Sequence, residues 1–120
     1  MDTRRSSSVA LTDILSAEVR ILESRELKER TLQAVGLENI YPDLVTSPPK
    51  HITPMEAGIL RFEKKLTVRP AQKGNIIEAK YEHEDPSIAS RTLNQIIAFY
   101  LEKRIEAYKE KTETVRRYEF

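Results

Sequence analysis

The sequence predicts an α+β fold, in which a small β-hairpin sheet packs with helices and a long helix ends the chain. Three observations lead to this prediction. Apolar residues recur at helical spacing in several segments, β-branched residues lie on both sides of a Gly-Asn pair at 74–75, and no glycine or proline follows Pro86. Because 120 residues is the length of one ordinary domain, we expect residues 9–120 to form a single α+β domain.

The composition excludes several classes of function. Twenty Lys and Arg residues stand against 19 Asp and Glu residues, for a net charge of +1, and no segment concentrates one sign. Nucleic-acid-binding domains carry a basic patch, so we expect no nucleic acid partner. The absence of cysteine excludes disulfides, thiolate catalysis and cysteine-based zinc sites. No apolar run approaches the roughly 20 residues that span a bilayer, and the first residues lack the continuous apolar segment of a signal peptide.

Two helices are expected in the N-terminal part of the chain. The polar, serine-rich residues 1–8 are expected to be a disordered lead-in or added residues. Apolar residues then recur at three- and four-residue steps over 11–23, as an amphipathic helix requires. Ser24 can cap a second helix, and Gly36 can end it in a left-handed conformation, with Leu37 folding back onto the last turn. The buried residues of this helix are expected to be Leu27, Thr31, Ala34 and Val35.

A proline-rich connection and a third helix follow. Residues 38–52 contain three prolines and show no helical period, so they are interpreted as a surface connection. Thr53, Pro54 and Glu56 then form the pattern of a capping threonine, a proline at the first helical position and a glutamate that reaches back to the cap. This pattern predicts a short helix over about 54–65.

A hairpin is predicted by the stretch LTVRPAQKGNIIEAKYEHE. Its strands are expected near 66–70 and 75–82, since Gly74-Asn75 is a typical hairpin turn. One face should be packed and the other wet. The packed face is expected to hold Leu66, Val68, Ile77, Ala79 and Tyr81, and the wet face Glu78 and Lys80. Because a two-stranded sheet alone is marginal, we expect a second copy of the chain, or residues near Val9, to cover its edge.

The longest element is expected to begin at Pro86. From there a stripe of apolar residues continues at helical spacing. Its members are Ala89, Leu93, Ile96, Ile97, Tyr100, Leu101, Ile105 and Tyr108. After Tyr108 the sequence is mixed in charge with few apolar residues, which a compact core would hardly need. We therefore expect either that this helix projects into solvent or that the chain is cut from a longer one. Ile97, Leu101 and Tyr108 form a candidate face for an oligomer or another partner.

The stretch EHEDPSIAS, residues 82–90, places His83 among three carboxylates and admits two interpretations. As a metal or acid/base site it lacks ligands, because zinc needs three or four and the other histidine, His51, lies far away in the sequence. As a strand-to-helix junction, the stretch contains the residues that begin a helix. Asp85 can accept hydrogen bonds from the exposed amides of the next turn, and Pro86 suits the first helical position. We therefore interpret Asp85, Pro86 and His83 as a structural junction and helix cap.

No other motif supplies chemistry. The chain has only three glycines and contains no G-x-S-x-G, phosphate-binding loop or H-E-x-x-H motif. Tyr81, Tyr100 and Tyr108 could stack on sugars, but at these spacings tyrosines are more often core or partner-facing residues. We therefore assign no catalytic, cofactor-binding or metal-binding residues, and we expect neither a cofactor nor enzymatic activity.

Two long segments are similar to segments of one known family. The first is EVRILESRELKERTLQAVGLENIYPDL, and the second is LTVRPAQKGNIIEAKYEHEDPSIASRTLNQIIAFYLEKR. They resemble the E-x-x-I-L-x-S-R-x-L…LGL segment and the G-x-x-I-E-x-x-y-x-H-x-D-P-x-x-A…N…y-L segment of the Wzz-type chain-length determinants, the polysaccharide co-polymerases. The matches keep their order and spacing and cover about residues 16 to 105. The second, more specific segment carries Asn75, Ile77, Glu78, His83, Asp85, Pro86, Ala89 and Asn94.

The resemblance implies a periplasmic α/β domain of a bacterial inner-membrane protein that sets the length of O-antigen, capsular or exopolysaccharide chains without catalysis. Family members form ring-like homo-oligomers around or beside the polymerase. The implied partners are therefore further copies, the polysaccharide polymerase and export machinery, and, as a further candidate, the growing polysaccharide.

Three family features are missing from this sequence. They are membrane helices at both ends, a first strand ahead of the matched segments, and a returning helix and strand after the long helix. We therefore expect this chain to be a fragment, with Met1 added, whose parent contacts the membrane through flanking helices outside it.

Two other functions are open at this point. One is a small hydrolase or metal-dependent enzyme that uses His83 and Asp85, which metal content and mutation would reveal. The other is a generic helical protein-interaction module, which shares the surface physics of a scaffold and differs from it in genetic context.

Overall fold

The computed structural model describes residues 17–70 and 76–119, and beyond Glu106 it describes the side chain of Lys109 only. The α+β fold is confirmed. A helical stretch at 17–22 comes first. The elements that follow are α2 (Arg25–Val35), α3 (Leu37–Ile40), α4 (Pro42–Thr46), α5 (Pro54–Lys65), β1 (Leu66–Pro70), β2 (Ile77–Tyr81) and α6 (Pro86–Glu119). The predicted lead-in at 1–8, the first part of the predicted helix over 11–23 and the hairpin turn at 74–75 lie outside the described residues.

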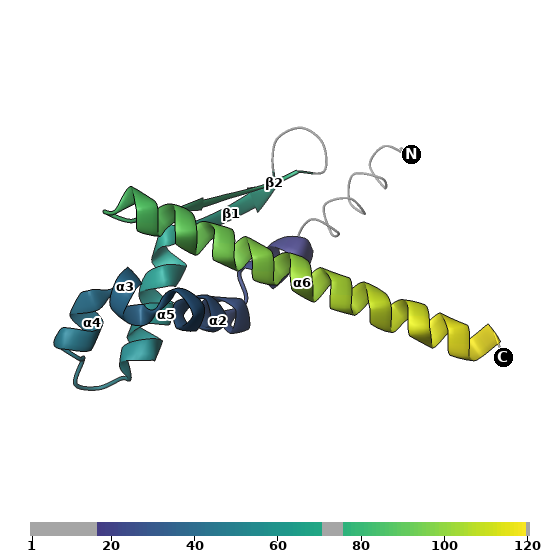
Figure 1. Ribbon diagram of the computed structural model, residues 1–120, viewed down its shortest axis with the longest axis horizontal. Helices are drawn as coiled ribbons and strands as arrows, with labels where there is room; N and C mark the ends of the chain where they lie inside the picture. The colour runs from purple at the N-terminus through teal and green to yellow at the C-terminus, as the bar shows by residue number, and fades with distance from the viewer. Residues whose placement is uncertain (1–16, 71–75, 120) are drawn as a thin grey trace, which may run out of the picture.

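The long helix α6 organises the described elements. In Figure 1 the hairpin lies behind its N-terminal half, and α2 to α5 gather below it, while its C-terminal part extends past the other labelled elements. α6 packs on α2, α3 and β2, and α5 contacts α2, α4 and β1. The bounds of α5 agree with the prediction of about 54–65, and α5 runs directly into β1.

The N-caps of α2 and α5 are local hydrogen bonds. Ser24 Oγ accepts from the amide of Leu27 (3.3 Å), and Thr53 Oγ1 accepts from the amide of Glu56 (3.1 Å), so both predicted caps are confirmed. The Glu56 side chain does not fill its predicted role at the cap, because its carboxylate lies 3.4 Å from Arg25 Nη2 on α2. A charged donor on a neighbouring helix is a stronger partner for a carboxylate than a neutral amide.

Gly36 ends α2, as predicted. Its φ of +102° is a conformation that glycine adopts without strain, and its amide donates to the carbonyl of Leu32 (3.0 Å). The chain then leaves the axis of α2 and begins α3 at Leu37, which packs against the core.

The core lies where α6, the hairpin and the shorter helices meet. Its buried apolar residues are Leu22, Leu27, Leu32, Val35, Ile40, Tyr41, Leu44, Ile59, Phe62, Leu66, Val68, Tyr81, Ile96 and Tyr100. Three of the four residues predicted for the buried stripe of α2 are buried, but Ala34 is exposed. Lys28 and Leu32 are buried as well, because α2 packs against both α5 and α6. The buried arc of α2 is therefore wider than expected and is rotated away from Ala34.

The interpretation of residues 38–52 as a surface connection is wrong for their first half. This part forms most of α3 and all of α4, and Ile40, Tyr41 and Leu44 are buried. Pro42 does not break the structure, because it occupies the first position of α4, where no intrahelical amide is needed. Residues 47–53 alone connect α4 to α5 without helix or strand.

The hairpin has the predicted alternation. β1 and β2 are antiparallel, with Leu66 opposite Tyr81 and Val68 opposite Ala79. Leu66, Val68 and Tyr81 are buried on the packed face and Ile77 and Ala79 are half-buried there. The alternate residues on the other face are exposed: Thr67, Arg69, Glu78 and Lys80. β2 begins at Ile77 rather than near residue 75. Contacts from α6 to β2 and from α5 to β1 supply the apolar cover that a two-stranded sheet needs.

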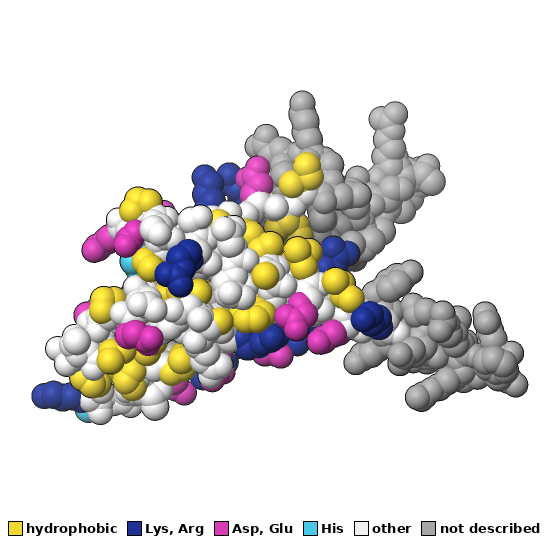
Figure 2. Space-filling model, viewed as in Figure 1, with side chains coloured by type: hydrophobic (Ala, Val, Ile, Leu, Met, Phe, Trp, Pro, Cys, Tyr) yellow, Lys and Arg dark blue, Asp and Glu magenta, His cyan; other side chains and the backbone are white. Residues whose placement is uncertain are grey.

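Only part of the predicted apolar stripe of α6 faces the core. Ile96 and Tyr100 are buried and Ile97 is half-buried, but Leu101 is 49% exposed and Ile105 is 56% exposed. A helix turns about 100° per residue, so a row spaced by four residues drifts about 40° at each step. The row from Ile97 to Ile105 therefore turns away from the core. Hydrophobic side chains, drawn in yellow, are visible on the open surface of the molecule in Figure 2.

Ion pairs tie the middle of α6 to the N-terminal helices. They are Lys103 with Glu26, Arg30 with Glu102 (3.7 Å) and Arg104 with Glu18 (3.2 Å). Exposed pairs contribute little stability each, so their main effect is to favour one orientation of α6. In the described ranges, no helix combines the length and the apolar character needed to cross a membrane.

Gly36→Ala should lower the free energy of unfolding by about 1–2 kcal/mol, because an L side chain is strained at positive φ. A Cβ at this position would also lie 2.7 Å from Glu38 Oε1. Gln33→Ala, at an exposed position of α2, is the control and should change stability by less than about 0.5 kcal/mol. Urea unfolding measures both. Equal midpoints for the two variants would contradict the role given to Gly36.

Candidate functional site

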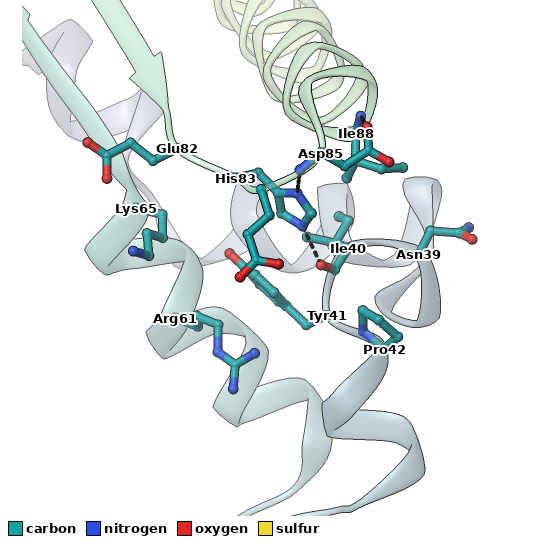
Figure 3. A pocket seen from close by; sticks show the side chains of 11 residues that line it. Asn39, Ile40, Tyr41, Pro42, Arg61, Lys65, Glu82, His83, Asp85 and Ile88 are labelled. Atoms are coloured by element: carbon teal, nitrogen blue, oxygen red, sulfur yellow. Dashed lines mark hydrogen bonds between the residues drawn. The ribbon is translucent and has the colours of Figure 1, made fainter.

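The His83 side chain joins the β2–α6 connection to the end of α3. Its Nε2 lies 2.6 Å from the carbonyl oxygen of Ile40, and its Nδ1 accepts a hydrogen bond from the amide of Asp85 (3.0 Å). Figure 3 shows the ring between these two main-chain groups. Because Nδ1 is the acceptor, the proton of the neutral ring is on Nε2, which donates to Ile40. His83 therefore links two segments that are 43 residues apart in the sequence.

Asp85 lies at the start of α6 in the geometry of a cap. Its Oδ1 accepts hydrogen bonds from the amides of Ser87 (2.9 Å) and Ile88 (3.4 Å), and its carbonyl accepts from the amide of Ala89 (2.9 Å). Pro86 is the first residue of α6 and has no amide hydrogen to leave unpaired. These are the hydrogen bonds that the junction interpretation requires.

A buried pair of phenols lies next to this junction. Tyr41 Oη and Tyr81 Oη are 2.6 Å apart, and both side chains are buried. The Tyr81 ring also packs on Phe62, with 4.9 Å between ring centres. Burial raises the pKa of both phenols, and the hydrogen bond with Tyr41 raises the pKa of Tyr81 further. The fold therefore favours the neutral form of this pair.

Arg61 connects the phenol pair to α4. Its guanidinium lies 5.0 Å from the centre of the Tyr41 ring, and its two terminal nitrogens donate to the two carboxylate oxygens of Asp43 (2.8 and 3.0 Å). The hydrogen bond with Arg61 lowers the pKa of Asp43, and the same bond raises the pKa of Arg61. A bidentate pair fixes the direction of both side chains, so Arg61 holds α5 and α4 together beside the junction.

A cleft of about 560 Å³ lies among these elements. Its lining residues are Asn39, Ile40, Tyr41, Pro42, Arg61, Lys65, Glu82, His83, Glu84, Asp85 and Ile88. Both ring nitrogens of His83 and the carboxylate of Asp85 are already bonded to the main chain. The His83 ring can therefore bind a metal or transfer a proton only by breaking a bond that holds the junction. In the described part of the chain, no three His, Asp or Glu side chains are placed to share a metal ion.

The residues predicted from the sequence fall in two separate places. His83, Asp85 and Pro86 lie together at the junction. Ile97 lies roughly 16 Å further along α6, at 1.5 Å per residue, half-buried beside the exposed Leu101. The side chain of Tyr108, the third residue of the candidate partner face, lies outside the described ones.

Two of the tyrosines considered for sugar stacking are core residues. Tyr81 and Tyr100 are each 8% exposed, so their ring faces are not open to a ligand. The Tyr100 hydroxyl donates to the Glu18 carboxylate. Burial, together with this hydrogen bond, raises the pKa of Tyr100 to about 12.

The contact between His83 and Ile40 and the pairs Tyr41–Tyr81 and Arg61–Asp43 were not predicted from the sequence. Each contact crosses between segments that are distant in the sequence. One signal was present, because Ile40, Tyr41 and Leu44 are apolar at helical spacing. Pro42 inside this pattern and the two prolines that follow it, Pro48 and Pro49, hid it.

No family model, curated protein or solved structure matches this chain. The role of the junction therefore rests on its own geometry.

His83→Ala should lower the free energy of unfolding by about 2 kcal/mol, because it leaves the Ile40 carbonyl and the Asp85 amide without their partner. Asp85→Ala should lower the free energy of unfolding by about 1 kcal/mol, because the helix cap is lost. Glu84→Ala, at an exposed neighbouring position, is the matched control and should be near neutral. Urea unfolding ranks the three. Stoichiometric zinc in the purified protein that disappears in His83→Ala would contradict the structural role.

Stability should fall at alkaline pH. Tyr41, Tyr81 and Tyr100 have pKa values raised by folding, so their contribution is complete below the ordinary tyrosine pKa of about 10. It is then lost as the pH rises through the folded pKa, which is about 12 for Tyr100. Urea midpoints across this range, with tyrosinate absorbance, measure the loss. Tyr81→Phe should make the decline shallower, and an equally steep decline in this variant would contradict the assignment.

Proposed function

We propose that this chain belongs to a non-catalytic regulator of surface polysaccharide chain length, similar to the Wzz-type co-polymerases. On this proposal it acts as an oligomeric scaffold with the polymerase and export machinery, in the periplasmic part of a bacterial inner-membrane protein. The observation that carries the proposal is where the two family-like segments touch. His83 of the second segment bonds to Ile40 of the first, and Tyr81 of the second bonds to Tyr41 of the first.

This contact provides a structural role for the residues that carry the resemblance. In the second segment, His83, Asp85 and Pro86 are part of the resemblance, and in the fold they form the link and the start of α6. A sequence pattern that serves to fix a long helix on a small α/β unit suits a scaffold. It suits an enzyme less well, because both nitrogens of the imidazole that a catalyst would use are bonded to main-chain groups.

The outer part of α6 supports the same proposal. Leu101 and Ile105 are exposed, large and apolar, and they lie on one side of a helix that extends past the other labelled elements. Three of the four residues that flank them in the sequence are charged, namely Glu102, Arg104 and Glu106. An apolar row between charged rows is typical of a helix surface that contacts another helix.

Leu101→Glu and Ile105→Glu in the full-length parent protein test this function. Both side chains are exposed, so a charge there leaves the core intact but disfavours an apolar partner contact. We expect polysaccharide to be made with a shifted or broader distribution of chain lengths on a gel. Arg91→Gln, at an exposed position near the start of the same helix, is the control and should leave the distribution unchanged.

Two results would contradict the proposal. Loss of all polysaccharide, or accumulation of its precursor, in a His83 variant that still folds would indicate an enzyme. Unchanged chain lengths both in the helix variants and after deletion of the parent gene would exclude a length regulator.

A further inference from the structure

The outer edge of β2 carries main-chain groups that no described strand uses. The amide of Glu82 donates to the carbonyl of Lys65 (3.1 Å), and these two residues are directly opposite in the register of the hairpin. In an antiparallel ladder, bonded and non-bonded pairs alternate. The residues of β2 that bond to β1 are therefore Glu78 and Lys80. The N–H and C=O groups of Ile77, Ala79 and Tyr81 point the other way.

The two edges of the hairpin are not equally available. On β1 the outward residues include Leu66, whose amide already donates to Phe62 at the end of α5, and Pro70, which has no amide hydrogen. β2 contains no proline between Ile77 and Tyr81. Among residues 17–70 and 76–119 the sheet has two strands only, so the outer edge of β2 has no strand beside it. In Figure 1, β2 runs along the rim of the molecule.

We propose that β2 pairs with β2 of a second copy of this chain, antiparallel and around a two-fold axis at Ala79. In this register Ala79 faces the partner's Ala79, and Ile77 faces the partner's Tyr81. These are the residues whose main-chain groups point outward, so each pair can exchange both of its hydrogen bonds. The result is a continuous four-stranded sheet.

The charges of β2 are complementary in this register. Glu78 faces the partner's Lys80, and by symmetry Lys80 faces the partner's Glu78. Both residues are on the exposed face, and opposite charges placed directly across two strands are stabilising. In the described part of the chain Lys80 belongs to no ion pair, while Glu78 Oε2 lies 3.4 Å from Arg69 Nε. A shift of the register by one residue would place Glu78 opposite the partner's Ala79 or Tyr81, which loses the two ion pairs.

The packed face also favours this arrangement. Ile77 and Ala79 are half-buried in a single copy, and a neighbouring strand would cover more of their apolar surface. This interface does not rest on the proposed function, because it depends on the chemistry of one strand.

Sedimentation equilibrium of the full chain, combined with amide hydrogen exchange, tests the proposal. We expect a concentration-dependent dimer. The amides of Glu78 and Lys80 should be protected at every concentration, whereas those of Ile77, Ala79 and Tyr81 should become protected only as the dimer forms. A monomer at all concentrations would overturn the proposal. Protection of the outward amides in a monomer would also overturn it, since another part of the chain, such as residues near Val9, would then cover the edge.

Charge reversal tests the register. Lys80→Glu and Glu78→Lys each place like charges opposite one another in a homodimer, so each should weaken association by about tenfold. An equimolar mixture of the two variants restores complementary charges and should associate as well as the unchanged protein. Lys64→Glu, an exposed residue near the end of α5, changes the net charge equally and should have no effect. Association that is insensitive to Lys80→Glu, or a mixture that does not recover, would overturn the register.

Discussion

The two hydrogen bonds of the His83 ring fix the position of α6 on the rest of the fold. Ile40 ends α3 and Asp85 precedes α6, so the carbonyl of one and the amide of the other lie at helix ends, where main-chain groups have no helical partner. One group needs a donor and the other needs an acceptor. A neutral imidazole offers one of each. A lysine offers donors only and an ionised glutamate acceptors only, so either would leave one of these groups unpaired.

The neighbouring contacts depend on this link because they lie between the same segments. Tyr81, two residues before His83, bonds to Tyr41, which follows Ile40. With two contacts side by side, β2 can neither slide nor rotate relative to α3 without breaking one of them. Arg61 then joins Tyr41 to Asp43. Most polar groups buried here are paired, and Thr92 Oγ1 is the exception among the described side chains.

The sequence predicted the elements well where the signal was local. The caps at Ser24 and Thr53, the end of α2 at Gly36 and the start of α6 at Pro86 depend on residues within four positions of one another. They need no knowledge of the rest of the fold. The alternation of the hairpin is also local, since it follows from the strand period of two.

The features that the sequence did not predict correctly share a physical cause. Each of them depends on tertiary packing between distant segments rather than on neighbouring residues. Ala34 was expected to be buried, but α2 lies between two helices, and their positions rotate its buried arc. The helices α3 and α4 are short and contain or follow turn-forming residues, so their propensity is low, and burial of Tyr41 and Leu44 stabilises them. The partners of His83 could not be predicted either, because one of them is a main-chain carbonyl, which every residue possesses and no sequence pattern marks.

The His83 link also has a consequence for any assembly of this chain. The outer edge of β2 and the exposed row of α6 at Leu101 and Ile105 are two candidate contact surfaces on elements that follow each other in the sequence. If the connection between β2 and α6 were flexible, a partner bound at the edge of β2 would not determine the orientation of α6. With His83 and Asp85 bonded at both ends of that connection, pairing through β2 would set the direction in which α6 extends. A short junction with hydrogen bonds at both ends thus converts a strand contact into a defined helix angle, so a two-fold pair formed through β2 would hold its two long helices at one fixed angle.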